Sequence, residues 1–321
     1  MIILAIDTSC DDTSIAILKI GNWKLKILSN IVSSQVKVHQ NYGGVYPTLA
    51  KREHQRNLPI VLKKALKEAG FEIFNFTTPL PPPSRLRRAP SFSIFKQIPK
   101  SKIPNINFIA VTVGPGLEPC LWVGVNFAKD LAQQWNLPII PVNHIEGHIL
   151  ANFLPKVSSN FQFSIFNFQK TFPAICLIVS GGHTQLILMT PVRKASLSNG
   201  AGKNWKYKII GETRDDAAGE CLDKTARILG LGYPGGPAIA ALAESFKFQA
   251  SSFKIKLPRP MINSKNYDFS FSGLKTAVLY DYKKRPEKIR RSKKYIGEMA
   301  KEIQQAIIDV LIKKTIRAAK D

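Results

Sequence analysis

The segment from Ile2 to Val32, IILAIDTSCDDTSIAILKIGNWKLKILSNIV, indicates the fold class. It contains three apolar or alternating runs that are rich in β-branched residues, and turn residues separate them. The runs are Ile2–Ile6, Ser14–Ile20 and Leu25–Val32, and the turns fall at Cys10-Asp11-Asp12 and Gly21-Asn22. This pattern predicts a β-meander at the start of an α/β protein.

Strands and helices alternate after the meander. Strands are predicted at Asn107–Val113 and Pro138–Val142, and each precedes a predicted helix, at Pro119–Trp135 and His144–Phe153. An earlier helix is expected over Pro59–Ala69, with Pro59 in its first turn.

A second series of the same kind begins at Ala174. Its predicted strands are Ala174–Val179, Thr184–Thr190 and Tyr207–Gly211, and its predicted helices lie near Asp216–Leu229, Pro237–Ser245, Ser272–Tyr282 and Lys293–Ala319. A meander followed by alternation, seen twice, predicts two related α/β lobes, placed here at residues 1–150 and 151–321. Residues 71–104, rich in proline and basic residues, and residues 160–171 are interpreted as loop insertions.

Composition narrows the class of protein. The 321 residues are 45% hydrophobic and 21% charged, which is typical of a globular protein, and no apolar run approaches the ~18 residues that span a bilayer. The lack of such a run predicts no membrane partner. The four cysteines form no CxxC pair, which predicts a reducing, cytoplasmic setting. The net charge of +24 favours a polyanionic partner such as RNA, although a basic surface can also simply stay solvated.

His144 and His148 are the sharpest local signal for chemistry. A spacing of four places both imidazoles on one face of the predicted helix, where they can chelate a divalent ion. Two ligands do not complete a site, so a carboxylate from elsewhere would be needed. The alternative is a pair of surface or capping histidines that bind no metal.

Glycine-rich turns are the second signal. They occur at Val179–Thr184 between two predicted strands, at Gly114-Pro115-Gly116, and at Gly235-Gly236-Pro237, which opens a helix. Glycines let backbone N–H groups approach phosphates, and helix N-termini favour anions. Each turn alone is weak evidence, but together they predict a nucleotide-like ligand held between the lobes.

Acidic residues form the third signal. Asp7, Asp11 and Asp12 lie on the first strand and in its hairpin turn, where a carboxylate could orient a metal, a water or a phosphate.

Farther along the chain, Asp215 or Asp216 is expected to cap the helix that follows. Within that helix Asp223 could take ribose hydroxyls, or it could be an exposed charge paired with Arg227.

Taken together, these residues resemble the tRNA N6-adenosine threonylcarbamoyltransferase family. The matching segments lie at Ile6–Ser14, Tyr42–Pro47, Gly114–Leu117, Asn143–His148, Val179–Thr184, Gly211–Glu220, Asp223–Ala226, Tyr233–Pro237 and Phe269–Thr276. They follow one another in the family's order and cover most of the chain outside the two insertions. The resemblance implies the actin, heat-shock-chaperone and sugar-kinase fold, with two ribonuclease-H-like lobes around a cleft.

The resemblance also implies an activity, a cofactor and partners. Threonylcarbamoyl-adenylate would donate its threonylcarbamoyl group to the N6 amine of the adenosine 3′ of the anticodon in tRNA. His144 and His148 would be metal ligands, with one iron or zinc ion per subunit and iron favoured. A related pseudo-enzyme subunit and a small ATPase are the implied partners in bacteria.

Carried over by position, the resemblance also implies residue roles. Asp11 would be catalytic and would help position the reacting group. The substrate-binding residues would be Ile178, Val179, Ser180, Gly181, Gly182, Asp223 and Gly236.

This sequence departs from the family pattern at three places. Asp12 and Thr48 stand where the family usually has Glu. The family continues past the helix ending near Ala319 with a Gly-Gly-Val strand and a Thr-Asp-Asn segment that supply further ligands. The resemblance therefore implies a C-terminally truncated chain whose second lobe is incomplete. The alternatives left open are a non-catalytic binding subunit and another actin-fold, ATP-dependent kinase.

Overall fold

The computed structural model describes residues 1–321 except 22–23, 72–104, 155–171, 193–204 and 247–251. The stretches interpreted as insertions lie outside the described residues, apart from Phe71. The chain divides into two compact units, Met1–Phe168 and Gln169–Asp321, and each is described by itself. Among the described helices, none has both the length and the apolar character needed to cross a membrane.

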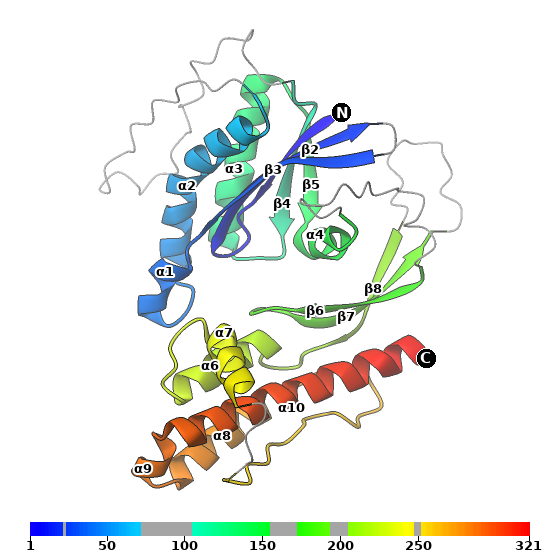
Figure 1. The fold of residues 1–321 in the computed structure, drawn as a ribbon. Coiled ribbons are helices and arrows are strands. Elements are labelled where there is room, and N and C mark those ends of the chain that lie inside the picture. Colours follow the sequence, from blue (N-terminus) through cyan, green and yellow to red (C-terminus); the bar gives the residue numbers. More distant parts are fainter. Residues whose placement is uncertain (22–23, 72–104, 155–171, 193–204, 247–251) are drawn as a thin grey trace. The chain divides into compact units, whose positions relative to one another are not determined.

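The first unit is built on a five-stranded mixed sheet with the order β3-β2-β1-β4-β5 (Figure 1). The antiparallel meander consists of β1 (Ile2–Asp7), β2 (Asp12–Gly21) and β3 (Lys24–Ser34). The strands β4 (Phe108–Gly114) and β5 (Ile139–Asn143) run parallel to β1. The predicted meander and both later strands are confirmed.

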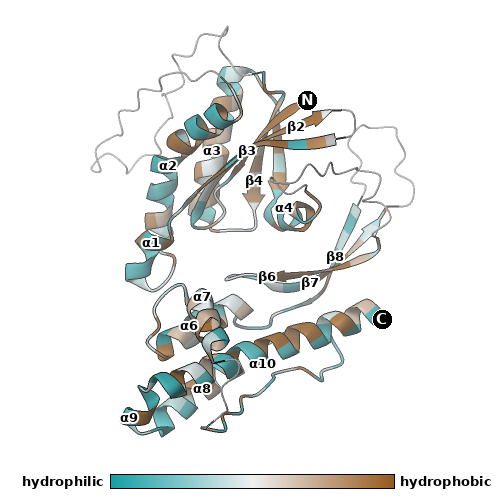
Figure 2. Ribbon diagram, viewed as in Figure 1, coloured by the Kyte–Doolittle hydropathy of each residue, from teal (hydrophilic) through white to brown (hydrophobic). Residues whose placement is uncertain are grey.

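Two long helices pack on one face of this sheet, α2 (Pro47–Glu68) and α3 (Glu118–Trp135) (Figure 1). Alternate strand residues such as Leu4, Ile6 and Ile15 are buried against them, because successive side chains of a strand point to opposite faces. The hydrophobic strand β4 is brown in Figure 2. Burying each such side chain stabilises the fold by about 1.5–3 kcal/mol.

The predicted start of the helix at Pro59 is wrong. The helix α2 begins at Pro47, and Pro59 lies inside it with its ring buried in the core. Pro47 suits the first turn because its missing N–H would have no intrahelical acceptor there. At Pro59 the helix loses one backbone hydrogen bond, and burial of the apolar ring offsets part of that cost. A short helix, α1 (Val36–His39), and a 3-10 turn, η1 (Gln40–Tyr42), precede α2.

The second unit combines a small sheet with several helices. The strands β6 (Ala174–Val179), β7 (Thr184–Pro191) and β8 (Trp205–Glu212) form an antiparallel sheet in that order. The helices are α6 (Ala218–Ile228), α7 (Gly235–Ser245), α8 (Ser272–Lys284), α9 (Glu287–Arg290) and α10 (Lys293–Lys320). The sequence predicted all of these except α9, with small differences at the ends.

Polar side chains of α10 hold the segment before α8 in place. Glu298 is almost fully buried and accepts the backbone N–H groups of Ser252 and Phe253. The fully buried Lys314 donates to the Ser264 hydroxyl and the Asn266 carbonyl, and burial lowers the pKa of Lys314 to about 8. These contacts fix the path of the chain toward the start of α8.

Candidate functional site

The two histidines lie on α4 (His144–Ala151), which begins directly where β5 ends. The side chain of Asn143 caps this helix by accepting the N–H groups of Ile145 and Glu146. The two imidazoles are one turn apart, and their Nε2 atoms are 3.1 Å from each other. The predicted placement of both rings on one helix face is confirmed.

Asp7, the last residue of β1, orients the first imidazole. Its Oδ2 lies 3.0 Å from His144 Nδ1 and accepts the Thr112 hydroxyl at 2.6 Å, while Oδ1 accepts the N–H and hydroxyl of Ser9. Burial alone would raise the pKa of Asp7, but the hydrogen bonds from His144, Thr112 and Ser9 outweigh it and hold the pKa well below its ordinary value. An ionised Asp7 favours a proton on His144 Nδ1, which leaves Nε2 with a lone pair facing His148.

The sequence did not identify Asp7 as the partner of a histidine. A signal was present, because β1, β4 and β5 were all predicted strands, and residues at the carboxyl ends of parallel strands meet at one edge of a sheet. Asp7 ends β1, and His144 follows β5.

The histidine pair fits a metal ion as two of its ligands. Two nitrogens at about 2.1 Å from a tetrahedral zinc lie about 3.4 Å apart, close to the separation found here. A carboxylate behind the distal nitrogen is the usual outer partner of a metal-binding histidine. Within the described ranges there is no group of three or more His, Cys, Asp or Glu residues that could hold a metal.

A hollow of about 130 Å³ opens on the sheet beside Asp7. The small side chains of Ala5, Ala16 and Ala110 leave this space, and Asp7 and Thr112 add polar groups to its lining. Its volume corresponds to about four water molecules. Because these strand residues are small, an unfilled space remains on the sheet next to Asp7.

Asp11 lies in the turn between β1 and β2. A buried histidine forms hydrogen bonds to residues on either side of Asp11. His54 of α2 is 0% exposed, with Nε2 2.9 Å from the Cys10 carbonyl and Nδ1 2.8 Å from the Thr13 hydroxyl. The N–H of Gln35 donates to the Asp11 carbonyl at 3.0 Å. Two backbone carbonyls of the turn, those of Cys10 and Asp11, are therefore held by hydrogen bonds to His54 and Gln35.

Sequence reasoning missed His54. Its signal was helical periodicity, because Ala50, His54, Leu58 and Leu62 recur every four residues and are all buried on α2. A histidine within such a stripe faces the core, where both ring nitrogens need partners.

In the second unit, the β6–β7 hairpin turn packs against the start of α6. The Ser180 carbonyl accepts the N–H of Gly219 at 3.2 Å, and the Thr184 hydroxyl accepts the N–H of Ala218 at 2.8 Å. Both bonds satisfy N–H groups that the first turn of a helix leaves without partners. The hairpin turn is therefore anchored to α6.

The start of α7 contacts α6 one turn farther along. The Oδ1 atom of Asp223 accepts the N–H of Gly235 at 2.7 Å, so the observed partner of this carboxylate is a helix N-terminus. Since Gly219 and Asp223 are four residues apart, the hairpin turn and α7 meet the same side of α6. The structure thereby gathers the predicted substrate-binding residues along α6, namely Ile178–Gly182, Asp223 and Gly236.

The glycines of this region fall into two kinds. A Cβ atom on Gly219 would lie 2.6 Å from the Ser180 carbonyl oxygen, and one on Gly235 would lie 2.7 Å from the Cα of Asp223, so close packing requires both glycines. A Cβ on Gly181 or Gly182 would meet nothing within 4 Å, and neither residue has a positive φ. The fold itself therefore does not require glycine at positions 181 and 182.

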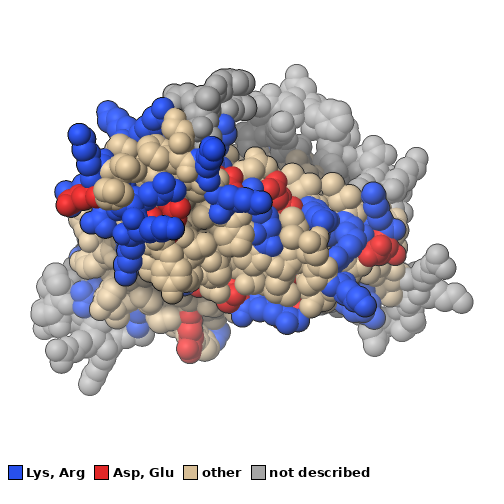
Figure 3. All heavy atoms as spheres, turned by 90° about the horizontal axis from the view of Figure 1, so that it is seen from below, with Lys and Arg blue, Asp and Glu red and all other residues tan. Residues whose placement is uncertain are grey.

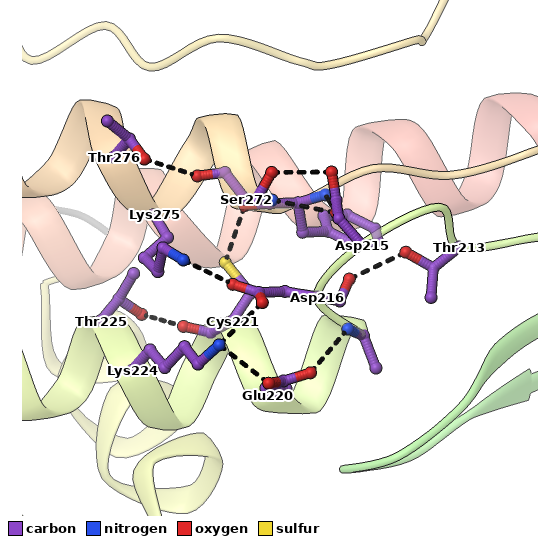
Figure 4. Close-up of polar contacts among 12 residues, drawn as sticks. Thr213, Asp215, Asp216, Glu220, Cys221, Lys224, Thr225, Ser272, Lys275 and Thr276 are labelled. Carbon is purple, nitrogen blue, oxygen red and sulfur yellow. Dashed lines mark hydrogen bonds and ion pairs between the residues drawn. The ribbon is translucent and has the colours of Figure 1, made fainter.

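Asp215 caps a helix other than the one predicted (Figure 4). Its carboxylate accepts the hydroxyls of Ser270 and Ser272 and the backbone N–H groups of Phe271 and Ser272, at the start of α8. Partial burial would raise the pKa of Asp215, but these hydrogen bonds outweigh it and lower the pKa. The predicted cap of α6 is wrong because a parallel bridge between Thr213 and Phe269 brings Asp215 opposite α8.

Asp216 forms ion pairs with two lysines. It lies 2.7 Å from Lys224 Nζ and 3.0 Å from Lys275 Nζ, which joins α6 to α8 (Figure 4). The first turn of α6 is served instead by Glu220, whose carboxylate accepts the N–H of Ala217 at 3.3 Å. Asp216 and the two lysines were not predicted as a unit, because the residues that form it are separated by up to 59 positions.

Fold and sites together define a mixed α/β protein with a histidine–carboxylate centre in its first unit and a glycine-turn region in its second. Its residues 26–77 and 94–321 match the model of the tRNA N6-adenosine threonylcarbamoyltransferase family. The chain belongs to that family.

Relatives with this name cover the whole chain. The tRNA N6-adenosine threonylcarbamoyltransferase of Thermosipho africanus is 42% identical over 100% of this chain and 78% of its own length, and that of Thermomicrobium roseum has the same identity and coverage. Among solved structures, the chain is similar to the Ppx/GppA family member of Aquifex aeolicus at a TM-score of 0.37 and 11% identity, over 100% of this chain and 91% of that one. That likeness is too slight to carry an argument.

The burial of His54 predicts a pH dependence of stability. Burial lowers the pKa of His54 below its ordinary value of 6.5, against the opposing effect of the Cys10 carbonyl and nearby aspartates. The unfolded chain then binds a proton that the folded chain does not, so the free energy of unfolding should fall as the pH drops from 7 to 5, by up to about 1.4 kcal/mol per pH unit. Urea denaturation at several pH values measures this slope.

The variant His54→Gln should show a flatter slope over that range, and His183→Gln serves as the matched control that keeps it. An unchanged slope in His54→Gln would show that another group causes the dependence.

Proposed function

We propose that this chain transfers a threonylcarbamoyl group from threonylcarbamoyl-adenylate to the N6 amine of the adenosine 3′ of the anticodon in tRNA. The supporting observation is the 42% identity that extends over the whole chain to proteins named for this transfer. The proposal includes a cytoplasmic location and two actin-like lobes, residues 1–150 and 151–321.

The reaction makes one bond and breaks another. The N6 lone pair attacks the carbamoyl carbon, a C–N bond forms, and the bond from that carbon to the phosphate oxygen breaks, so that AMP leaves with the electron pair and N6 loses a proton. The adenylate is already an activated anhydride, and the protein has mainly to orient the reactants and stabilise developing charge. Asp11 would position the reacting group from its fixed turn.

Residues of the second unit would hold the adenylate. The turn Ile178–Gly182 would lie against the nucleotide or the acyl part, and the open space above Gly181 and Gly182 supports this role. Asp223 already accepts the N–H of Gly235 through Oδ1, and its Oδ2 would take a ribose hydroxyl. Gly236, whose Cβ position meets only Leu222 at 3.8 Å, would contact the nucleotide closely.

His144 and His148 would hold one divalent metal ion, iron in the first place and zinc as the alternative. When bound, such an ion would polarise a carbonyl or phosphate oxygen as a Lewis acid. Asp7 would keep His144 in the tautomer that presents Nε2, as the observed hydrogen bond supports. A related pseudo-enzyme subunit and a small ATPase would be the protein partners.

The transfer can be tested directly. The purified chain, supplied with threonylcarbamoyl-adenylate, ferrous iron and an unmodified tRNA, should yield threonylcarbamoyladenosine, detected by mass spectrometry of the digested nucleosides. A tRNA with guanosine in place of the target adenosine should yield none. Binding of tRNA without any modified nucleoside would contradict the transferase and favour a non-catalytic binding subunit.

Metal binding provides a second test that needs no activity. We expect His144→Ala to abolish bound metal, because it removes one of two imidazole ligands, and Asp7→Asn to weaken metal affinity about 10- to 100-fold. Elemental analysis and competition with a chromogenic chelator measure both. His183→Ala should retain full metal content, and the same retention in His144→Ala would refute the assignment.

The glycine turn provides a third test. Gly182→Ala should fold with unchanged or slightly raised stability, since its Cβ meets nothing, yet bind AMP at least about tenfold more weakly because the methyl group occupies the space of the ligand. The control Gly219→Ala should lose about 1–3 kcal/mol of stability through its clash with Ser180. Urea denaturation and calorimetric titration with AMP give the two quantities. If Gly182→Ala binds AMP with wild-type affinity, the turn does not take part in nucleotide binding.

A further inference from the structure

Positive charge is concentrated where α8 ends and α10 begins. The stretch 283–294 contains eight Lys and Arg residues and one acid, Glu287. Six of these cations are exposed, and they define the α8–α10 basic patch: Lys283, Lys284, Lys288, Arg291, Lys293 and Lys294. Figure 3 shows Lys and Arg side chains gathered at one end of the face that these helices form.

The patch is poorly neutralised by the protein itself. Arg291 pairs with Glu287 at 2.9 Å, but both side chains are largely exposed, and such pairs contribute little. Within the described part of the chain, no carboxylate lies at ion-pair distance from the other five cations. Two of them, Lys293 and Lys294, stand in the first turn of α10, where the helix dipole disfavours positive charge. The unfavourable interaction of these charges with the helix dipole destabilises the folded chain, and a polyanion bound at the patch would offset it.

A partly buried polar cluster connects the two helices that carry the patch. Asp281 of α8 accepts both the guanidinium of Arg285 and the hydroxyl of Tyr295, a fully buried residue of α10. Burial and the neighbouring Asp281 raise the pKa of the Tyr295 hydroxyl, so it stays protonated as a donor. Because Asp281 ties α8 to α10, the backbone positions that carry the cations are fixed relative to one another before a ligand binds.

An exposed aromatic ring adjoins the patch. Tyr280 is 67% exposed, the most exposed of the large apolar and aromatic side chains that the structure describes. It lies four residues before Lys284 on α8 and therefore on the same helix face. Aromatic rings beside cations are the means by which proteins stack unpaired bases while holding the backbone.

We propose that the α8–α10 basic patch binds the phosphate backbone of the tRNA substrate and that Tyr280 stacks on one of its unpaired bases. The choice of tRNA rests on the proposed function, whereas the charge and the ring are features of the structure. An anionic membrane is disfavoured, because surface-binding helices insert several large apolar side chains and Tyr280 is the only strongly exposed one in residues 280–294.

Salt dependence of binding tests the electrostatic part. In the test variant, Lys283, Lys284, Lys293 and Lys294 are all changed to Gln. The negative slope of log affinity against log salt should become shallower by about 3, because each lost phosphate contact reduces its magnitude by roughly 0.7–0.9. The control changes four exposed lysines of the first unit to Gln, namely Lys26, Lys37, Lys64 and Lys67, and alters the net charge equally. Fluorescence anisotropy with labelled tRNA between 50 and 200 mM salt gives the slopes.

A reduced slope in the patch variant and not in the control supports the proposal; equal slopes in the two variants overturn it. Binding requires no transfer, so a patch-dependent slope without modified nucleoside would reject the proposed function and leave the patch standing. If modified nucleoside forms but the patch variant has the wild-type slope, the proposed function stands and the patch proposal is rejected. Wild-type binding to anionic phospholipid vesicles that the patch variant loses, with tRNA binding intact, would also overturn it.

Tyr280→Ala tests the stacking part. It should weaken tRNA binding roughly fivefold or more and leave binding to a fully paired RNA duplex unchanged, because a duplex offers no unstacked base. Equal losses for both RNAs would indicate a structural effect, and no loss for either would exclude the stacking. Thermal unfolding of each variant confirms that the second unit remains folded.

Discussion

One constraint underlies the first unit: the strands β1, β4 and β5 are parallel, so their carboxyl ends lie at one edge of the sheet. Asp7, Thr112 and His144 consequently meet within hydrogen-bonding distance although 105 and 137 residues separate Asp7 from its two partners. The carboxylate, held ionised by its donors, determines which imidazole nitrogen faces His148. The geometry of the histidine pair, which we propose binds a metal, therefore depends on strand order as much as on helical spacing.

The second unit is organised around α6. The hairpin turn reaches the helix at Gly219, the start of α7 reaches it at Asp223, and Asp216 links it to α8 through Lys275. Two of the glycines there are needed for close packing, while Gly181 and Gly182 are not. This contrast separates glycines that the fold requires from glycines that leave room for a ligand, and it supports the assignment of the turn to nucleotide binding.

Charge distribution connects the fold with the proposed substrate. The net charge of +24 suggests a polyanion but no location. Packing of α8 against α10 through Asp281 and Tyr295 turns a local run of basic residues into an ordered surface beside an exposed ring. The same run in an unfolded segment would be a solvated charge cluster without geometry.

Local patterns in the sequence were sufficient to predict most strands and helices, the shared face of His144 and His148, and the family, because each rests on periodicity or motifs within a few residues. Three contacts became visible only in the folded chain: Asp7 orients His144, His54 supports the turn of Asp11, and Asp215 caps α8. The structure also shows that α2 begins at Pro47 rather than Pro59, because burial of the Pro59 ring offsets part of the cost of a proline inside a helix. Local spacing specifies neighbours within a turn, whereas partners 40 to 140 residues apart depend on strand order and packing, which no local pattern encodes.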